Sequence, residues 1–437
     1  MRFRILTPLI LLFASIQFSR GQQVLTLEDA VKTALENNFQ IRIAKNDVEI
    51  AENNVSRASA GMLPTVTGNF TNNNSIQNGT QTRTTGEVNT TRNGKGSTLN
   101  YGANLNWTIF DGFRMFARYD QLKALQKLGE ANLQLTVLAN VGDVILRYYD
   151  LVQQQRQIKA YDTAVAISGL RVKTAQAKFE IGKSARLEVL NAQVDYNTDT
   201  TSLLRQRELF RNNQIVLNEL MGRSVDDDFT VVDNVPLNNA LNLAQLRDIA
   251  AQQSPSLQAA LLSRRISELD LKQVKADRYP VVGLTSGYFR NRNKAALGFS
   301  TLNTSNGFNY GVTASINIFN GFLQKRNEKN AQIAIESAQL DYDRVKQSIN
   351  SQLASAFQSY QTNLSLLKLE ENNQRIAKQN LDITLEKYKL GSISQMEIRD
   401  AQLNFLNASV RLNTAISQAK QSEINLLEIS GSLNLKN

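Results

Sequence analysis

Residues 109–113 read Ile-Phe-Asp-Gly-Phe, and residues 318–322 read Ile-Phe-Asn-Gly-Phe. The two pentapeptides are 209 positions apart (318 − 109). The same offset relates Phe-Glu-Ile-Gly at 179–182 to Tyr-Lys-Leu-Gly at 388–391, and it relates Gly222 to Gly431. Two copies that stay in register over roughly a hundred residues predict an internally duplicated architecture with fixed helix lengths and turn positions.

The segments between these motifs predict two very long helices. Residues 113–179 contain no proline, and residues 322–388 contain neither proline nor glycine. Each segment has 67 residues (179 − 113 + 1), which corresponds to about 100 Å of helix. Gly182 and Gly391 stand where a left-handed C-cap is expected, so each long helix should reverse there into a shorter one. The predicted helical hairpins are 113–221 and 322–429.

Ahead of each long helix the hydrophobic period changes from helical to alternating. Apolar residues occupy every second position at 99–110 and 308–319, with Asn, Gly, Thr and Ser between them. Alternation over about ten residues is typical of outer-membrane barrel strands. Weaker strands are predicted after two prolines, at about 65–72 and 281–289, and polar loops are predicted at 71–98 and 290–306. The expected membrane-facing side chains are Tyr101, Leu105, Trp107, Phe308, Tyr310 and Ile316.

An ordinary half-buried sheet with its apolar face inward is the alternative interpretation of these strands. Four strands cannot close a barrel, because natural barrels start at about eight strands. Lipid also tolerates no open sheet edge. If the strands meet lipid, several chains must therefore share one barrel.

Composition excludes several classes of site. The chain has no cysteine and no histidine, which removes disulfides, thiol nucleophiles, Cys/His zinc sites and histidine acid–base chemistry. The net charge of +10 is interspersed rather than gathered into a basic stripe, so nucleic acid is not an expected partner. A di-metal carboxylate site in a bundle would need Glu-x-x-His. We expect no enzyme activity, no metal and no cofactor.

The N-terminus, residues 1–21, reads as a cleaved signal peptide. Arg2 and Arg4 precede an apolar segment at 5–16 that is too short to span a membrane. No cysteine follows, so lipidation of the new N-terminus is not expected. The predicted organisation is a first repeat at 22–222, a linker at 223–240 and a second repeat at 241–437. Shorter helices open each repeat, including one at about 41–62 that stops before Pro64.

The chain resembles the TolC-like outer membrane efflux proteins along essentially its whole mature length. The shared pattern begins with Leu-x-Leu-x-x-Ala at 25–30 and Pro64, and continues with Ile-Phe-Asp-Gly at 109–112. Phe-x-x-Gly at 179–182 and Val-Leu-x-Ala-Gln at 189–193 follow, and the pattern recurs in the second half. Many members have a second glycine where this chain has Phe113 and Phe322, so we expect altered packing at the helix start.

The resemblance implies a mainly helical homotrimer. Three chains would supply twelve strands to one membrane β-barrel and twelve helical columns to a periplasmic α-barrel, with residues 223–240 in an equatorial belt. The implied function is that of a channel-tunnel in the outer membrane of a Gram-negative bacterium. It would be the passive exit duct of a tripartite efflux system, such as multidrug efflux, or of a type I secretion system. A periplasmic adaptor coupled to an inner-membrane pump would open it.

The resemblance also implies roles for residues at the hairpin tips. Glu397 and Asp400 would form a gate of carboxylates, although Ser394 and Glu397 also match a helix capping box. Tyr388 and Glu188 would link neighbouring hairpins as a latch, while Ile393 replaces an arginine that assists this latch in a known member. Gly182 and Gly391 would form the tip turns that an adaptor contacts. The implied strand-to-helix junctions are Gly112, Phe113, Gly321 and Phe322.

Two other classes of protein remain in competition with a channel. A periplasmic adaptor would carry one hairpin flanked by small β-domains rather than two hairpins that each follow amphipathic strands. A structural coiled-coil protein of the envelope would have no pore and no need for asparagine-lined alternating strands.

Overall fold

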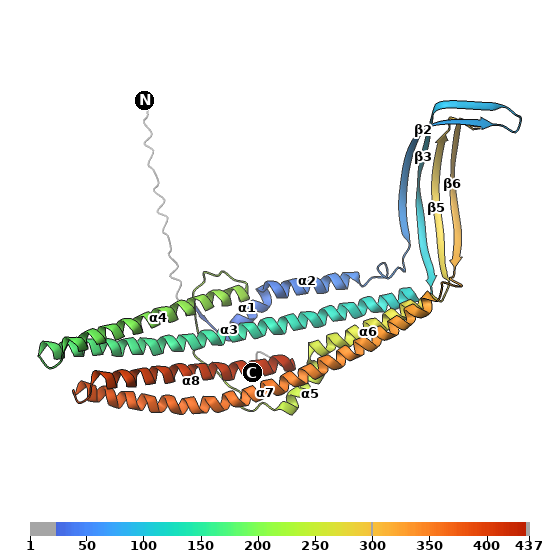
Figure 1. The fold of residues 1–437 in the computed structure, drawn as a ribbon. Helices are drawn as coiled ribbons and strands as arrows, with labels where there is room; N and C mark the ends of the chain where they lie inside the picture. The colour runs from blue at the N-terminus through green and yellow to red at the C-terminus, as the bar shows by residue number, and fades with distance from the viewer. Residues whose placement is uncertain (1–22, 299, 434–437) are drawn as a thin grey trace, which may run out of the picture.

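The computed structural model describes residues 23–298 and 300–433, and it contains the same order of elements twice (Figure 1). The predicted signal peptide at 1–21 lies outside the described residues. The elements in chain order are β1 (Gln23–Leu25), α1 (Leu27–Asn37), α2 (Phe39–Asn54), β2 (Thr65–Thr82), β3 (Val88–Asp111), α3 (Arg114–Glu180), α4 (Arg186–Met221), β4 (Phe229–Val231), α5 (Leu243–Gln253), α6 (Pro255–Ala276), β5 (Val281–Lys294), β6 (Leu302–Ser315), α7 (Leu323–Lys389) and α8 (Gln395–Ser430).

The two long helices confirm the predicted length. α3 and α7 have 67 residues each, and the return helices α4 and α8 have 36 each. Both long helices start one residue later than predicted, because Phe113 and Phe322 take left-handed conformations with φ of 69° and 64°. The hairpin tips lie at one end of the molecule, and the sheet stands at the other (Figure 1).

The helices form four columns, of which two are continuous and two are built from helices stacked end to end. α3 packs on α4 and α8 toward the tips, and on α2 and α6 toward the sheet. At one stacking point, the Asn38 amide donates to the carbonyl of Leu220 at 2.8 Å. A Cβ on Gly222 would lie 2.5 Å from the Asn37 carbonyl oxygen, and one on Gly431 would lie 3.1 Å from that of Gln253. The repeated glycines therefore let successive helices approach closely.

The predicted helix at 41–62 is wrong at its C-terminal end. α2 stops at Asn54, and the Oγ of Ser56 accepts a hydrogen bond from the backbone N–H of Ser59 at 3.0 Å. Asn, Val and Ser are poor helix formers, and serine side chains favour such local turns over helix continuation. The proline at 64 therefore follows a turn rather than ending the helix.

The strands form one antiparallel sheet in the order β2-β3-β5-β6, in which β3 pairs with β5 and joins the two β-hairpins. The predicted loops at 71–98 and 290–306 are wrong in extent. β2 and β3 stay paired up to Thr82 and Val88, and β5 pairs with β6 up to Lys294 and Leu302. These outer positions lack apolar alternation, but backbone hydrogen bonds continue the ladder without it.

The last predicted strand, 308–319, is wrong at its end. β6 stops at Ser315, so Ile316 follows the strand rather than lying in it. Gly311 and Thr313 still pair with Thr285 and Gly283 just before that point. Among the described residues, no helix has the length and apolar character needed to cross a membrane.

The largest buried cluster lies halfway along the helices, where the linker crosses them. β1 and β4 form a two-stranded parallel sheet there. The Tyr148 hydroxyl of α3 donates to the carbonyl of Leu25 and accepts from the N–H of Val232, both at 3.1 Å. Burial raises the pKa of Tyr148. The start of the described chain and the linker are therefore bound to the same helix.

Candidate functional site

The two hairpin turns at the tips have nearly the same geometry. Gly182 and Gly391 have φ of 70° and 78°. The N–H of Lys183 donates to the carbonyl of Lys178 at 2.8 Å, and the N–H of Ser392 donates to that of Lys387 at 3.0 Å. Left-handed glycine followed by such a bond is a standard helix ending. No atom lies within 4 Å of where either Cβ would be, so the backbone conformation alone requires glycine.

The two predicted gate carboxylates are both exposed on the first turns of α8. Glu397 is part of a complete capping box: its Oε1 accepts from the Ser394 N–H at 3.3 Å, and its own N–H donates to the Ser394 Oγ at 3.3 Å. Asp400 makes no hydrogen bond or ion pair within the described part of the chain. Asp400 is therefore the gate candidate without a structural duty.

Tyr388 is buried, with only 2% of its surface exposed. It packs against Leu381, Ile398 and Ala401, and the Lys178 ammonium of the first hairpin lies 4.7 Å from its ring centroid. Burial raises the pKa of Tyr388, Arg171 opposes this shift and Glu188 adds to it. No hydrogen bond joins Tyr388 to Glu188 within the described chain, so their predicted latch contact stays a prediction.

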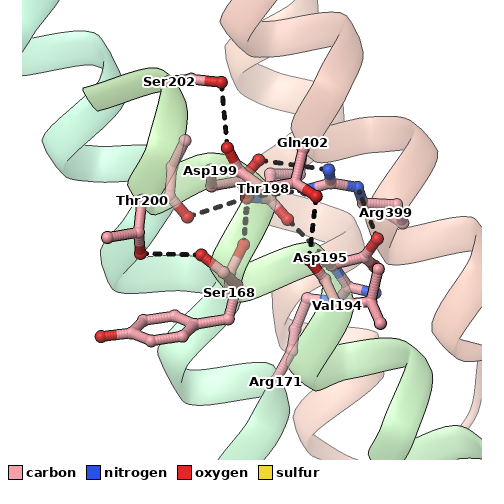
Figure 2. Close-up of polar contacts among 12 residues, drawn as sticks. Ser168, Arg171, Val194, Asp195, Thr198, Asp199, Thr200, Ser202, Arg399 and Gln402 are labelled. Carbon is pink, nitrogen blue, oxygen red and sulfur yellow. Dashed lines mark hydrogen bonds and ion pairs between the residues drawn. The ribbon is translucent and has the colours of Figure 1, made fainter. Parts of the chain in front are cut away.

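A buried polar network lies just behind the tips and joins the two hairpins (Figure 2). Arg171 of α3 is 1% exposed, and its Nη2 donates to Asp195 of α4 at 2.9 Å. Arg399 of α8 donates to both carboxylate oxygens of Asp199 on α4, at 2.7 and 3.1 Å. The two arginines and two aspartates balance in charge. The Arg171–Asp195 pair joins α3 to α4 within the first hairpin, and the Arg399–Asp199 pair binds α8 to that hairpin.

Gln402 of α8 completes this network. Its Nε2 shares its two N–H groups among three acceptors, the carbonyl of Ala164, the Ser168 Oγ and Asp199, at 2.9, 2.8 and 2.9 Å. Ser168 also donates to Asp199. One donor stays unsatisfied, since the Arg171 Nε has no hydrogen-bond partner among the described residues. Removing one member of a buried charge pair typically costs about 3–5 kcal/mol, so this network can hold the hairpins together.

The sequence analysis missed this network, and comparing the two copies position by position could have found it. At the 209-residue offset, charged residues of one copy correspond to neutral residues at the equivalent positions of the other copy. The pairs are Arg171 with Asn380, Asp195 with Asn404, Asp199 with Ala408, and Arg399 with Leu190. Charges that only one copy carries are not needed for the shared fold.

The strand-to-helix junctions hold two successive left-handed residues. Gly112 and Gly321 have φ of 71° and 65°, and each is followed by a phenylalanine with positive φ. Phe113 stacks edge-on against Phe110 with ring centroids 5.2 Å apart, and Phe322 does so against Phe319 at 5.4 Å. The left-handed conformation is unfavourable for a phenylalanine, so these junctions are locally strained.

Five of the six predicted membrane-facing side chains share one face of the sheet. In the register, Trp107 is opposite Leu284, which is opposite Val312. Leu105 is on the same face, opposite Ser286, which pairs with Tyr310. The Trp107 indole N–H donates to the carbonyl of Met62 at 2.9 Å. Ile316 does not belong to this strand face, because it follows the end of β6.

Comparison with known proteins gives one consistent result. A family model described as outer membrane efflux protein matches residues 30–223 and 246–432. The outer membrane efflux protein BepC of Brucella suis is 22% identical over 418 residues, which cover 94% of this chain and 87% of BepC. The outer membrane protein TolC of Escherichia coli is 20% identical over 449 residues, covering 98% of this chain and 87% of TolC.

Solved structures share the fold. The CmeC outer membrane channel of Campylobacter jejuni superposes with a TM-score of 0.77 at 17% identity, covering 94% of this chain and 87% of CmeC. The outer-membrane channel OprN superposes with a TM-score of 0.75 at 17% identity, covering 93% and 90% of the two chains. At this identity the likeness concerns the arrangement of helices and strands.

Proposed function

Because the chain belongs to the outer membrane efflux protein family, we propose that it is the outer-membrane channel-tunnel of a tripartite efflux system. In this proposal three copies assemble around one passive pore, which a periplasmic adaptor opens and an inner-membrane pump supplies. Type I secretion uses the same kind of duct and is the second candidate. The adaptor and the pore-free coiled-coil alternatives fit poorly, since the chain has two hairpins that each follow a pair of strands.

The single observation that carries the proposal is that both edges of the protomer present groups that lack a packing or pairing partner within the described chain. The sheet ends on β2 and β6, and neither has an outer pairing partner in the described residues. An open edge cannot face lipid, because its backbone groups would lack hydrogen bonds. Pairing β2 of one copy with β6 of the next closes twelve strands with three chains.

The two outer helices of the helical part each expose a stripe of apolar side chains. α4, at one edge of the columns, exposes Leu187, Val194 and Leu204 by 65%, 63% and 59%. α7, at the other edge, exposes Leu369, Ile376 and Ile383 by 55%, 51% and 59% at seven-residue spacing. Apolar heptad stripes of this kind pack as coiled coils. We infer that α4 of one copy packs against α7 of its neighbour.

The hairpin tips supply the gate in this proposal. Threefold repetition brings the exposed carboxylates of Asp400 and Glu397 into a ring, and such rings favour cations. The Arg399–Asp199 pair and the donation of Arg171 to Gln402 keep α8 against the first hairpin in the proposed closed state. An adaptor that binds the turns at Gly182 and Gly391 opens the channel by separating the hairpins there.

Planar bilayer recording of the detergent-purified protein tests the proposal. We expect discrete single-channel steps, cation selectivity and block by divalent cations. Size-exclusion chromatography with light scattering should give three copies per particle. An absence of conductance from intact particles would overturn the channel, whereas particles of another copy number would overturn only the shared twelve-stranded barrel.

A further inference from the structure

The face of β5 that lines up with Trp107 and Tyr310 changes abruptly from apolar to basic along the strand. Its lower part carries Leu284 and Tyr288, and the next three positions on the same face are Arg290, Arg292 and Lys294. Pairing of β5 with β3 from Leu284 to Lys294, and with β6 throughout, is free of bulges. Alternate residues of a regular strand share a face. The three cations, called here the basic column, therefore continue the line of the membrane-facing side chains.

The height of the basic column matches the outer boundary of a membrane. Arg290 is nine residues beyond Val281 (290 − 281), which begins the strand at the helical end. Nine residues span about 30 Å along a strand, or about 23 Å of height at a tilt of about 40°. The apolar band of a membrane barrel is about 25 Å tall. The column thus starts where acyl chains end and lipid headgroups begin.

The basic column has no carboxylate to pair with. Residues 281–322 contain no Asp or Glu, and residues 65–111 contain only Glu87 and Asp111. Glu87 forms an ion pair with Arg83 at 2.7 Å, and Asp111 accepts from the N–H of Met115 at the start of α3. The three side chains are exposed, and none forms an ion pair within the described residues.

The strands beside β5 supply hydrogen-bonding groups at the same levels. Asn306 is opposite Arg290, and Thr304 is opposite Arg292 on β6. Ser97 is opposite Lys294 on β3. Guanidinium, ammonium, hydroxyl and amide groups together suit phosphate oxygens. Below them the aromatic pair Phe308 and Tyr310, with ring centroids 6.2 Å apart, offers an apolar surface.

We propose that the basic column binds the phosphate groups of anionic lipids in the outer leaflet. β5 is an inner strand of the sheet, so the site belongs to a single protomer and lies away from the edges where copies would meet. The inference rests on the proposed outer-membrane barrel, because that orientation turns this face to lipid. Three copies would hold three such sites around the barrel.

Native mass spectrometry of the detergent-purified full chain tests the site. The probes are a diphosphorylated lipid A, its phosphate-free form and inorganic phosphate. The test variant combines Arg290→Gln, Arg292→Gln and Lys294→Gln. The matched control combines Lys346→Gln, Lys368→Gln and Lys378→Gln, which remove the same charge from exposed positions of α7.

We expect the test variant to bind the diphosphorylated lipid roughly 100-fold more weakly, since each basic side chain near an anionic surface contributes about fivefold. The control variant should bind it like the wild type, and the phosphate-free lipid should bind all three proteins weakly. Equal binding by the test variant and the wild type would overturn the proposal. Full displacement of the lipid by an equimolar amount of inorganic phosphate would also overturn it, because the site would then be a free-anion site.

Conductance in zwitterionic bilayers separates this inference from the proposed function. The test variant should conduct like the wild type there. Loss of phosphorylated-lipid binding with normal conductance supports the basic column alone. A wild type that binds the lipid but never conducts would instead contradict the channel.

Discussion

The two hairpin tips share a backbone but not their charges. Both long helices have 67 residues, and both turns use a left-handed glycine. Yet Arg171 and Asp195 in the first hairpin correspond to Asn380 and Asn404 in the second. Tyr388 in the second tip is 2% exposed, whereas its counterpart Phe179 is 39% exposed. Glycines and apolar spacing thus set the shape of both copies, and residues unique to one copy bind the hairpins together.

Among single substitutions at the tips, Arg171→Met should have the largest effect. It removes the partner of Asp195 within the first hairpin and the two donations of Arg171 to α8, to the Gln402 Oε1 at 3.3 Å and the Gln395 carbonyl at 3.4 Å. About 3–5 kcal/mol of stability should be lost around the network. We expect a higher conductance at rest and a lower thermal midpoint in detergent. Asn380→Met, at the equivalent exposed position, is the control and should leave both unchanged. A closed, wild-type-like Arg171→Met channel would exclude the network as a latch.

Replacing the whole network with apolar residues tests whether the loss in Arg171→Met comes from unpaired buried charge. The variant with Arg171→Met, Asp195→Leu, Asp199→Leu and Arg399→Met leaves no buried charge unpaired. Well-packed apolar residues often replace buried ion pairs without loss of stability. We therefore expect its thermal midpoint to be higher than that of Arg171→Met. A lower midpoint would mean that the charges stabilise the closed tips beyond their mutual pairing.

The strand-to-helix junctions give the next largest contrast. Gly112→Ala places a Cβ 2.4 Å from the Ala276 carbonyl oxygen, whereas Gly321→Ala meets no atom within 4 Å. Both carry the left-handed penalty of about 1–2 kcal/mol, and overpacking adds about 1–3 kcal/mol to Gly112→Ala alone. Thermal unfolding should rank Gly112→Ala as the less stable variant. Equal midpoints would show that the C-terminal end of α6 shifts to accommodate the added methyl group without loss of stability.

The proposed gate residues Glu397 and Asp400 can be tested without disturbing the backbone of the tips. Glu397→Gln keeps a capping-box residue, and Asp400→Asn keeps the side-chain shape. Together they should weaken divalent block by roughly tenfold, which corresponds to about 1.4 kcal/mol. Asn191→Ala, at the position equivalent to Asp400, is the control. Unaltered block in the double variant would remove both residues from the gate.

The smallest effect concerns Glu428 and its counterpart Glu219. Burial, and then Asp143, raises the pKa of Glu428 above its ordinary value of 4.5. The folded state therefore holds this proton more tightly, and the resulting stabilisation is complete below pH 4.5 and lost as the pH rises through the folded pKa. Glu428→Gln should raise the thermal midpoint at pH 8 slightly, by less than about 1 kcal/mol in stability. Glu219→Gln, at an exposed site, should not; equal responses would contradict the burial effect.

The helical hairpins could be predicted to within a residue because glycines mark their ends and no proline interrupts them. The outer strand halves could not, because Asn, Thr and Gly carry no apolar alternation around positions such as Asn73 and Asn293. The polar network was hidden for another reason. Asp195 and Asp199 are one helical turn apart and resemble a solvated face until α8 supplies Arg399. Which charges become buried is decided by tertiary packing, which one helix does not encode.

The unbroken run of α3 and α7 also fixes a distance. With 67 residues each, backbone rise alone separates the sheet from the tips by about 100 Å. Neither pH nor side-chain chemistry adjusts that depth. Removing one heptad from every helix of both hairpins would bring the tips about 10 Å closer to the sheet. The length of the two helices therefore sets how far from the sheet any partner of the tips would have to bind.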